Sequence, residues 1–154
     1  MMQTQLAGQG SATSTLAVVV LVMNLLWLGA GFVYFVAMPR RSTYGLIGSG
    51  QATPEGRRGA AGLVVFLGGL NLALFSLAAL TLLRLDEFSE SLLAVPITAL
   101  MVGHGSQFLV NVPVAIREAT KRDAPWRVSA FPMNLIFALD ATLAVANLVL
   151  LLQL

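Results

Sequence analysis

Four long apolar runs constrain the fold of this chain more than any other feature. They extend over residues 15–38, 59–83, 91–116 and 130–154. A helix needs roughly 20 predominantly apolar residues to cross the hydrocarbon core of a bilayer, so each run is long enough to do so. Charged residues make up only 10% of the chain, whereas about a quarter is usual in soluble domains. The sequence therefore predicts an integral membrane protein.

An all-α, multi-pass bundle of four transmembrane helices is the fold that these runs favour. Open strands are excluded because lipid offers no partners for unpaired backbone groups. A β-barrel would require alternating polar and apolar residues, whereas these runs are continuous. The segment before residue 15 lacks the basic residues of a signal peptide, so we expect the first run to be a retained helix. Residues 1–154 then form a single membrane domain.

Basic residues are concentrated in two of the three connections between the runs. The first connection contains Arg40, Arg41, Arg57 and Arg58, and the third contains Arg117, Lys121, Arg122 and Arg127. The second has Arg84 beside three acidic residues. Cytoplasmic loops of membrane proteins carry an excess of Lys and Arg. We therefore expect a protein of the cell membrane with the first and third loops in the cytoplasm and both termini on the non-cytoplasmic side.

The loops themselves indicate no catalytic or nucleotide-binding function. The first connection, residues 39–58, is rich in glycine and predicts a flexible crossing, but it lacks the lysine of a phosphate-binding loop. The third is expected to prolong the preceding helix until Pro125 stops it. A net charge of +2 is too small to indicate a nucleic-acid partner.

Two stripes of polar residues within the spans form the candidate site. His104, Gln107 and Asn111 follow the spacing i, i+3, i+7, which places them on one face of a helix. Asp140 and Asn147 are seven residues apart, so they point within about 20° of the same direction. Residue counting places Asp140 at the depth of Gln107 and close to His104, so the stripes are expected to face each other. The candidate ligand-binding residues are His104, Gln107, Asn111, Asp140 and Asn71.

Asp140 is the most informative of these residues because it is the only carboxylate within a span. An acidic side chain at mid-bilayer costs at least roughly 2.5–3.5 kcal/mol, so it should face protein or water. One hypothesis makes Asp140 a proton carrier, a cation site or a ligand anchor. The other makes it a neutral acid bonded to a neighbouring helix. We expect a neutral pair, in which Asp140 is protonated or shares a proton with His104.

His104 is the only histidine of the chain, and this limits the cofactors that can be considered. It excludes a bis-histidine haem within one chain, and no second strong ligand forms a zinc site, so no metal site is predicted. His104 could still serve as the single axial ligand of a haem or a chlorophyll-type macrocycle. The favoured interpretation is a neutral imidazole that is hydrogen-bonded to Asp140 or to a backbone carbonyl. The other asparagines, including Asn24, are interpreted as packing residues. For the aromatic Trp27, core packing is favoured over a place in the lining of an apolar pocket.

Three functional classes fit these observations, and the cofactor stays unknown. The sequence favours an accessory or assembly subunit of a larger membrane complex, because catalytic motifs are absent. The second class is a small membrane enzyme or binding protein for a lipophilic ligand, and the third an oligomeric proton- or cation-linked carrier. The expected partners are the lipid bilayer, other membrane chains or a second copy, and a lipophilic small molecule. A continuous cavity reaching Asp140 would favour the second class.

The expected topology can be tested directly because the chain has no cysteine. Single cysteines at Ser42, Ser89 and Thr120 are exposed to an impermeant thiol reagent in intact cells. We expect labelling at Ser89 alone, and at the other two positions only after permeabilisation. Labelling of Ser42 and Thr120 but not of Ser89 would reverse the orientation.

Overall fold

The computed structural model describes residues 2–47 and 53–154, with side chains for 15–46 and 53–154. Within these ranges the chain is helical and contains no strand: the elements are α1 (Met2–Ala37), α2 (Pro39–Ile47), α3 (Pro54–Leu83), η1 (Leu85–Glu87), α4 (Glu90–Ala119) and α5 (Met133–Leu151). Four stretches, Thr15–Ala37 of α1 and the whole of α3, α4 and α5, are long and apolar enough to cross a membrane. The predicted all-α bundle of four spans is confirmed.

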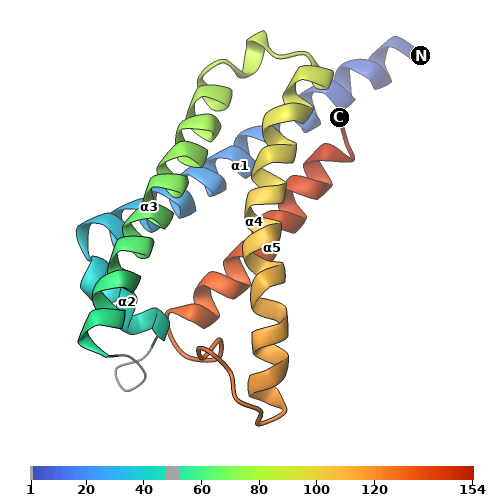
Figure 1. The fold of residues 1–154 in the computed structure, drawn as a ribbon. Coiled ribbons are helices and arrows are strands. Elements are labelled where there is room, and N and C mark those ends of the chain that lie inside the picture. The colour runs from blue at the N-terminus through green and yellow to red at the C-terminus, as the bar shows by residue number, and fades with distance from the viewer. Residues whose placement is uncertain (1, 48–52) are drawn as a thin grey trace.

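In Figure 1, α1 and α5 run obliquely to the steeper helices α3 and α4. Helix α1 packs most extensively against α3, and α4 against α5, while α1 also contacts α5. Both termini and the α3–α4 connection lie at one end of the bundle. Helix α2 and residues 120–132 lie at the other, which we call the basic end because it carries eight of the nine basic residues. Which side of the membrane this end faces stays a prediction.

The apolar core occupies the half of the bundle next to the termini. Its centre is a cluster in which Leu21, Ile97 and Leu150 have no exposed surface. The cluster also contains Leu28 and Leu100. Tight packing of this kind holds helices together in lipid, where the hydrophobic effect between spans is weak. The half toward the basic end contains the cavities described below.

The first connection is more helical than its glycine content suggests. Helix α2 occupies residues 39–47, and α3 begins at Pro54 rather than at the expected residue 59. The Thr53 hydroxyl caps α3 by accepting a hydrogen bond from the Gly56 amide at 3.1 Å, and Pro54 occupies the first helical position. The prediction of a flexible crossing is therefore wrong for residues 39–47 and 53–58, while residues 48–52 lie outside the described part of the chain.

The third connection also differs from its prediction. Helix α4 ends at Ala119, well before Pro125, and α5 begins at Met133 rather than at residue 130. Lys121 has a φ of 55°, a left-handed conformation that does not continue a helix. Beyond this turn the Ser129 amide and hydroxyl both donate to the Glu118 carboxylate, which ties the connection back to α4.

Helix α2 packs against α3 and α1, and its Gly45 lies against Pro132, the residue that precedes α5. Ser42 is fully buried and donates to the Pro39 carbonyl at 3.0 Å. A Cβ atom added at Gly45 would lie 2.8 Å from Pro132 Cδ and 3.2 Å from the Tyr34 hydroxyl. Glycine is thus required by this close approach. Because Ser42 is inaccessible, Tyr44, which is 49% exposed, is the better cysteine reporter for this loop.

We expect Gly45→Ala to lower the melting temperature of the detergent-solubilised protein, measured by circular dichroism. The added methyl group overpacks the contact with Pro132, a change that typically costs about 1–3 kcal/mol. Gly59→Ala is the matched control, because nothing lies within 4 Å of its added Cβ. It should stabilise α3 by roughly 0.5–1 kcal/mol. Equal upward shifts in both variants would contradict the close packing of α2 against α5.

Candidate functional site

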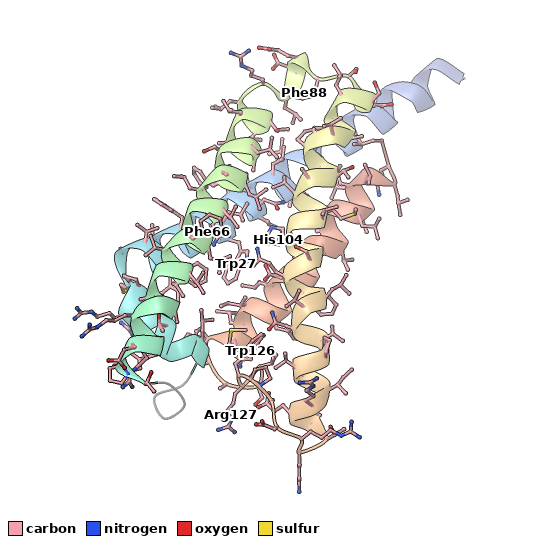
Figure 2. All side chains as sticks on the ribbon, in the orientation of Figure 1. Trp27, Phe66, Phe88, His104, Trp126 and Arg127 are labelled. Atoms are coloured by element: carbon pink, nitrogen blue, oxygen red, sulfur yellow. The ribbon has the colours of Figure 1, made fainter. Side chains whose placement is uncertain are left out.

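A buried histidine–aspartate pair joins α4 to α5 at the middle of the bundle. His104 Nδ1 lies 2.9 Å from Asp140 Oδ1. Exposure is 0% for His104 and 1% for Asp140. The expected bond between the imidazole and Asp140 is confirmed, so the two polar stripes meet at this pair. Figure 2 places His104 and Trp27 near mid-height, with Trp126 closer to the basic end.

Two asparagines, Asn24 of α1 and Asn147 of α5, complete the network on the Nε2 side of the imidazole. Asn24 Nδ2 donates to the Val20 carbonyl at 2.8 Å and to Asn147 Oδ1 at 3.2 Å. Asn147 Nδ2 donates in turn to the Leu143 carbonyl at 2.8 Å and to Asn24 Oδ1 at 3.2 Å. Because a backbone carbonyl can only accept, each amide nitrogen has to lie where it does. Asn24 Oδ1 is therefore the atom that faces His104 Nε2, at 3.0 Å.

This arrangement determines where the protons of the pair lie. Asn24 Oδ1 can only accept, so His104 Nε2 carries a hydrogen and donates it. Nδ1 and Asp140 Oδ1 then share one proton between them, either as imidazole and carboxylic acid or as imidazolium and carboxylate. Both forms contain the same number of protons and have no net charge. Trp27 Nε1 donates to the same Oδ1 at 3.1 Å and completes its hydrogen bonding.

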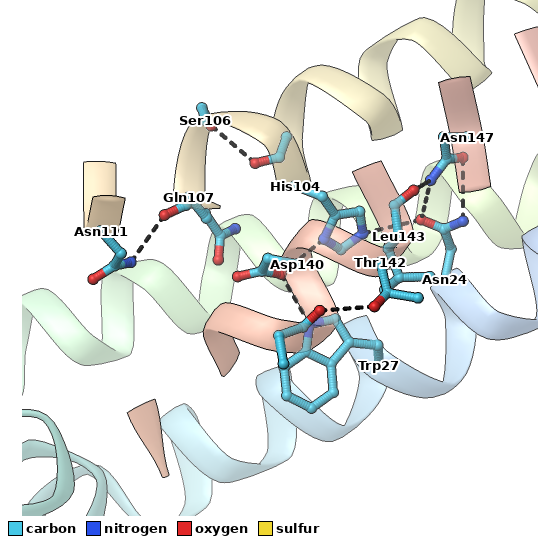
Figure 3. A network of polar contacts seen from close by, with 12 residues as sticks. Asn24, Trp27, His104, Ser106, Gln107, Asn111, Asp140, Thr142, Leu143 and Asn147 are labelled. Carbon is cyan, nitrogen blue, oxygen red and sulfur yellow. Dashed lines mark hydrogen bonds and ion pairs between the residues drawn. The ribbon is translucent and has the colours of Figure 1, made fainter. Parts of the chain in front are cut away.

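The second carboxyl oxygen of Asp140 has no such partner. Oδ2 is buried, and no hydrogen-bond donor contacts it among the described residues. Figure 3 shows that it points away from His104, toward the side of the network where Gln107 lies. Since the shared proton is on the Oδ1 side, Oδ2 can only accept a hydrogen bond. Leaving a buried polar atom unsatisfied costs about 1–3 kcal/mol, so this atom is a ready acceptor for a donor from outside the protein.

Asp140 and His104 line a cavity of about 350 Å³. The cavity extends from this pair toward the basic end, where Met38, Arg41 and Phe131 line it. Its walls are mainly apolar and aromatic, and they are contributed by Trp27, Leu28, Ala30, Gly31, Tyr34, Phe35, Pro132, Leu135 and Ile136. A chamber of this kind, apolar with a few polar groups at defined positions, is typical of small-molecule sites.

A second cavity of about 260 Å³ adjoins the first and shares Phe35, Gln107 and Ile136 with it. It lies between α3 and α4, with Leu67 on one wall and Val110 on the other. Val110 is 63% exposed on the surface that would face lipid. The second cavity thus lies beside the first and reaches the lateral surface of the bundle at Val110.

Two further predicted residues, Asn71 and Gln107, also line the first cavity. Asn71 comes close to α1 because residue 31 is glycine, where an added Cβ would lie 2.6 Å from Asn71 Nδ2. Neither side-chain amide forms a hydrogen bond with another described residue, so both are available to a bound molecule. Asn111 differs, since its amide donates to the Gln107 carbonyl and accepts from Trp126 Nε1, each at 2.9 Å. It lines only the second cavity.

Four lining or supporting residues were missed as site residues in the sequence: Asn24, Trp27, Tyr34 and Arg41. Packing was the favoured interpretation of the first two, with pocket lining as the alternative for Trp27, although both contact the His104–Asp140 pair. A signal was present, because Asn24, Trp27 and Tyr34 follow the spacing i, i+3, i+10 and share one face of α1. Arg41 carries no such pattern and reaches the cavity only through the position of α2.

Comparisons with protein families, curated proteins and solved structures found no match to this chain. Across the described residues, no group of three or more His, Cys, Asp or Glu side chains lies close enough together to hold a metal ion. The chemistry of the site therefore has to be inferred from the hydrogen-bonding residues and the cavity.

The proton arrangement can be tested by nitrogen NMR, because His104 is the single histidine of the chain. In protein labelled with ¹⁵N-histidine, we expect Nε2 to be protonated and hydrogen-bonded. Asn24→Leu removes the acceptor of Nε2 and a partner of Asn147, so it should shift the Nε2 signal and destabilise the protein by about 1–3 kcal/mol. Asn134→Leu, on the exposed face of α5, is the control. A neutral imidazole protonated only at Nδ1 would contradict the assignment.

Proposed function

We propose that this chain is a membrane-embedded binding protein for a lipophilic molecule that donates a hydrogen bond to Asp140. The observation that carries the proposal is the buried Oδ2 of Asp140, which lacks a partner and can only accept. A ligand hydroxyl or N–H group would satisfy it. Nearby, the free amides of Asn71 and Gln107 can each donate and accept, so they would orient the same end of the ligand.

The cavity supports a ligand-binding role over the accessory-subunit role that the sequence favoured. Its volume of about 350 Å³ lies within the range of small-molecule sites, roughly 300–1,000 Å³. Trp27 and Phe35 offer aromatic walls to an apolar body, and the adjoining cavity between α3 and α4 offers a path from the lipid. A packing subunit would have no need of a chamber that ends at an unsatisfied carboxyl oxygen.

We place the protein in the cell membrane with its basic end toward the cytoplasm, following the distribution of arginine and lysine. The first cavity would then occupy the inner half of the bilayer. In this arrangement the ligand's donor lies near mid-membrane, and the rest of the molecule extends toward the cytoplasmic surface. His104, Asn24 and Trp27 would hold Asp140 in place without touching the ligand's donor.

The proposal is tested by mass spectrometry of lipophiles that co-purify with the protein from native membranes in mild detergent. We expect a defined lipophile bearing an O–H or N–H donor to be retained by the wild type. Ile136→Trp fills the wall shared by both cavities, and Asp140→Leu removes the acceptor. Both should lower retention about tenfold or more: Ile136→Trp because its side chain occupies the space of the ligand, and Asp140→Leu because it removes a hydrogen bond that contributes roughly 1.5 kcal/mol.

Leu109→Trp is the matched control, because Leu109 is 65% exposed on α4 and lines neither cavity. It should retain the lipophile as the wild type does. A water molecule could also satisfy Oδ2. In that case no lipophile would be enriched over the detergent blank, or Ile136→Trp would retain it fully, and the proposal would be wrong.

A further inference from the structure

We infer that the ligand is a single-chain amphiphile with a neutral hydroxyl at its buried end and a carboxylate at the basic end, that is, a hydroxylated fatty acid of medium length. This inference rests on the proposed function and specifies its ligand class. Three features carry it: the uncharged His104–Asp140 pair, the position of Arg41, and the apolar wall between them.

The buried end of the cavity favours a neutral donor over a cation. Oδ2 of Asp140 accepts a hydrogen bond, but His104 and Asp140 share one proton and together carry no net charge. An ammonium group placed here would be buried without a compensating charge, which is far more costly than burying a hydroxyl that is hydrogen-bonded. A hydroxyl can donate to Oδ2 and accept from the amide of Asn71 or Gln107.

The opposite end of the cavity favours an anion. Arg41 lines it and is otherwise exposed, and its guanidinium forms no ion pair with the described residues. Arg40, Arg57 and Arg58 belong to the same connection, with only Glu55 opposing them. A planar guanidinium binds a carboxylate through two parallel hydrogen bonds. A cationic ligand, by contrast, would be repelled on its way in from this end.

The distance between the two ends limits the length of the ligand. Arg41 and Gly45 are one turn apart on α2, and Gly45 contacts Pro132 at the start of α5. Pro132 precedes Asp140 by eight residues, which corresponds to about 12 Å along a helix. The wall in between is apolar and includes Leu135 and Ile136. A saturated chain of medium length can therefore lie between the two polar groups.

The test measures binding of three probes: ω-hydroxydecanoic acid, decanoic acid and decanol. Trp126→Phe leaves Trp27 as the only tryptophan, and Trp27 lines the cavity, so its fluorescence reports binding in non-ionic detergent. We expect the hydroxy acid to bind at least tenfold more tightly than either single-ended probe. In this background Arg41→Gln should reduce its affinity to that of decanol, and Asp140→Leu to that of decanoic acid.

Arg40→Gln is the matched control, since Arg40 is exposed and does not line the cavity. It should leave all three affinities unchanged.

If decanol binds the wild type as tightly as the hydroxy acid, or if Arg41→Gln changes nothing, the inferred carboxylate of the ligand is wrong while the proposed function stands. If a bilayer phosphatidylglycerol displaces the hydroxy acid and binds more tightly, the anion is a lipid headgroup and the fatty-acid class is wrong. If no probe gives a saturable change, the fatty-acid class is wrong, and the proposed function is decided by the co-purification experiment alone.

Discussion

The bond between His104 and Asp140 is the interaction on which the rest of this structure depends. An acidic group at mid-bilayer has to be neutral or paired, and it has to face protein. Here the imidazole of α4 provides the partner, while Trp27 and Asn24 of α1 and Asn147 of α5 surround the pair. Three helices are therefore brought to one point by polar groups that lipid cannot satisfy. Their relative rotation follows from this requirement.

The hydrogen-bonded network also divides the bundle into a tightly packed half and a half that contains cavities. On the side of the termini, Leu21, Ile97 and Leu150 are packed without exposed surface and hold the helices together. On the side of the basic end, the helices border two adjoining cavities that are partly open. Asp140 lies at the boundary, with one oxygen in the network and the other without a partner. The tightly packed core and the cavities thus occupy separate parts of a small chain.

The ends of the elements show where reasoning from hydropathy stops. The four spans were predictable because lipid requires long apolar helices, and each of them is present. The start of α3 and the end of α4 were predicted several residues from their true positions, because Thr53 caps the former and Lys121 turns the chain after the latter. Such local hydrogen bonds and dihedral angles lie in polar segments, where hydropathy carries no information.

Helical periodicity in the sequence was enough to place His104 and Gln107 on one face and to identify Asp140 as the group that needs a partner. It could not show that Asn24 and Trp27 complete the pair, that Asn111 turns instead to Trp126, or that Arg41 reaches the cavity. The reason is physical: a membrane helix is apolar nearly all round, so its sequence does not specify which side meets which neighbour. Those contacts depend on how α1, α2 and α5 pack across long separations in the chain.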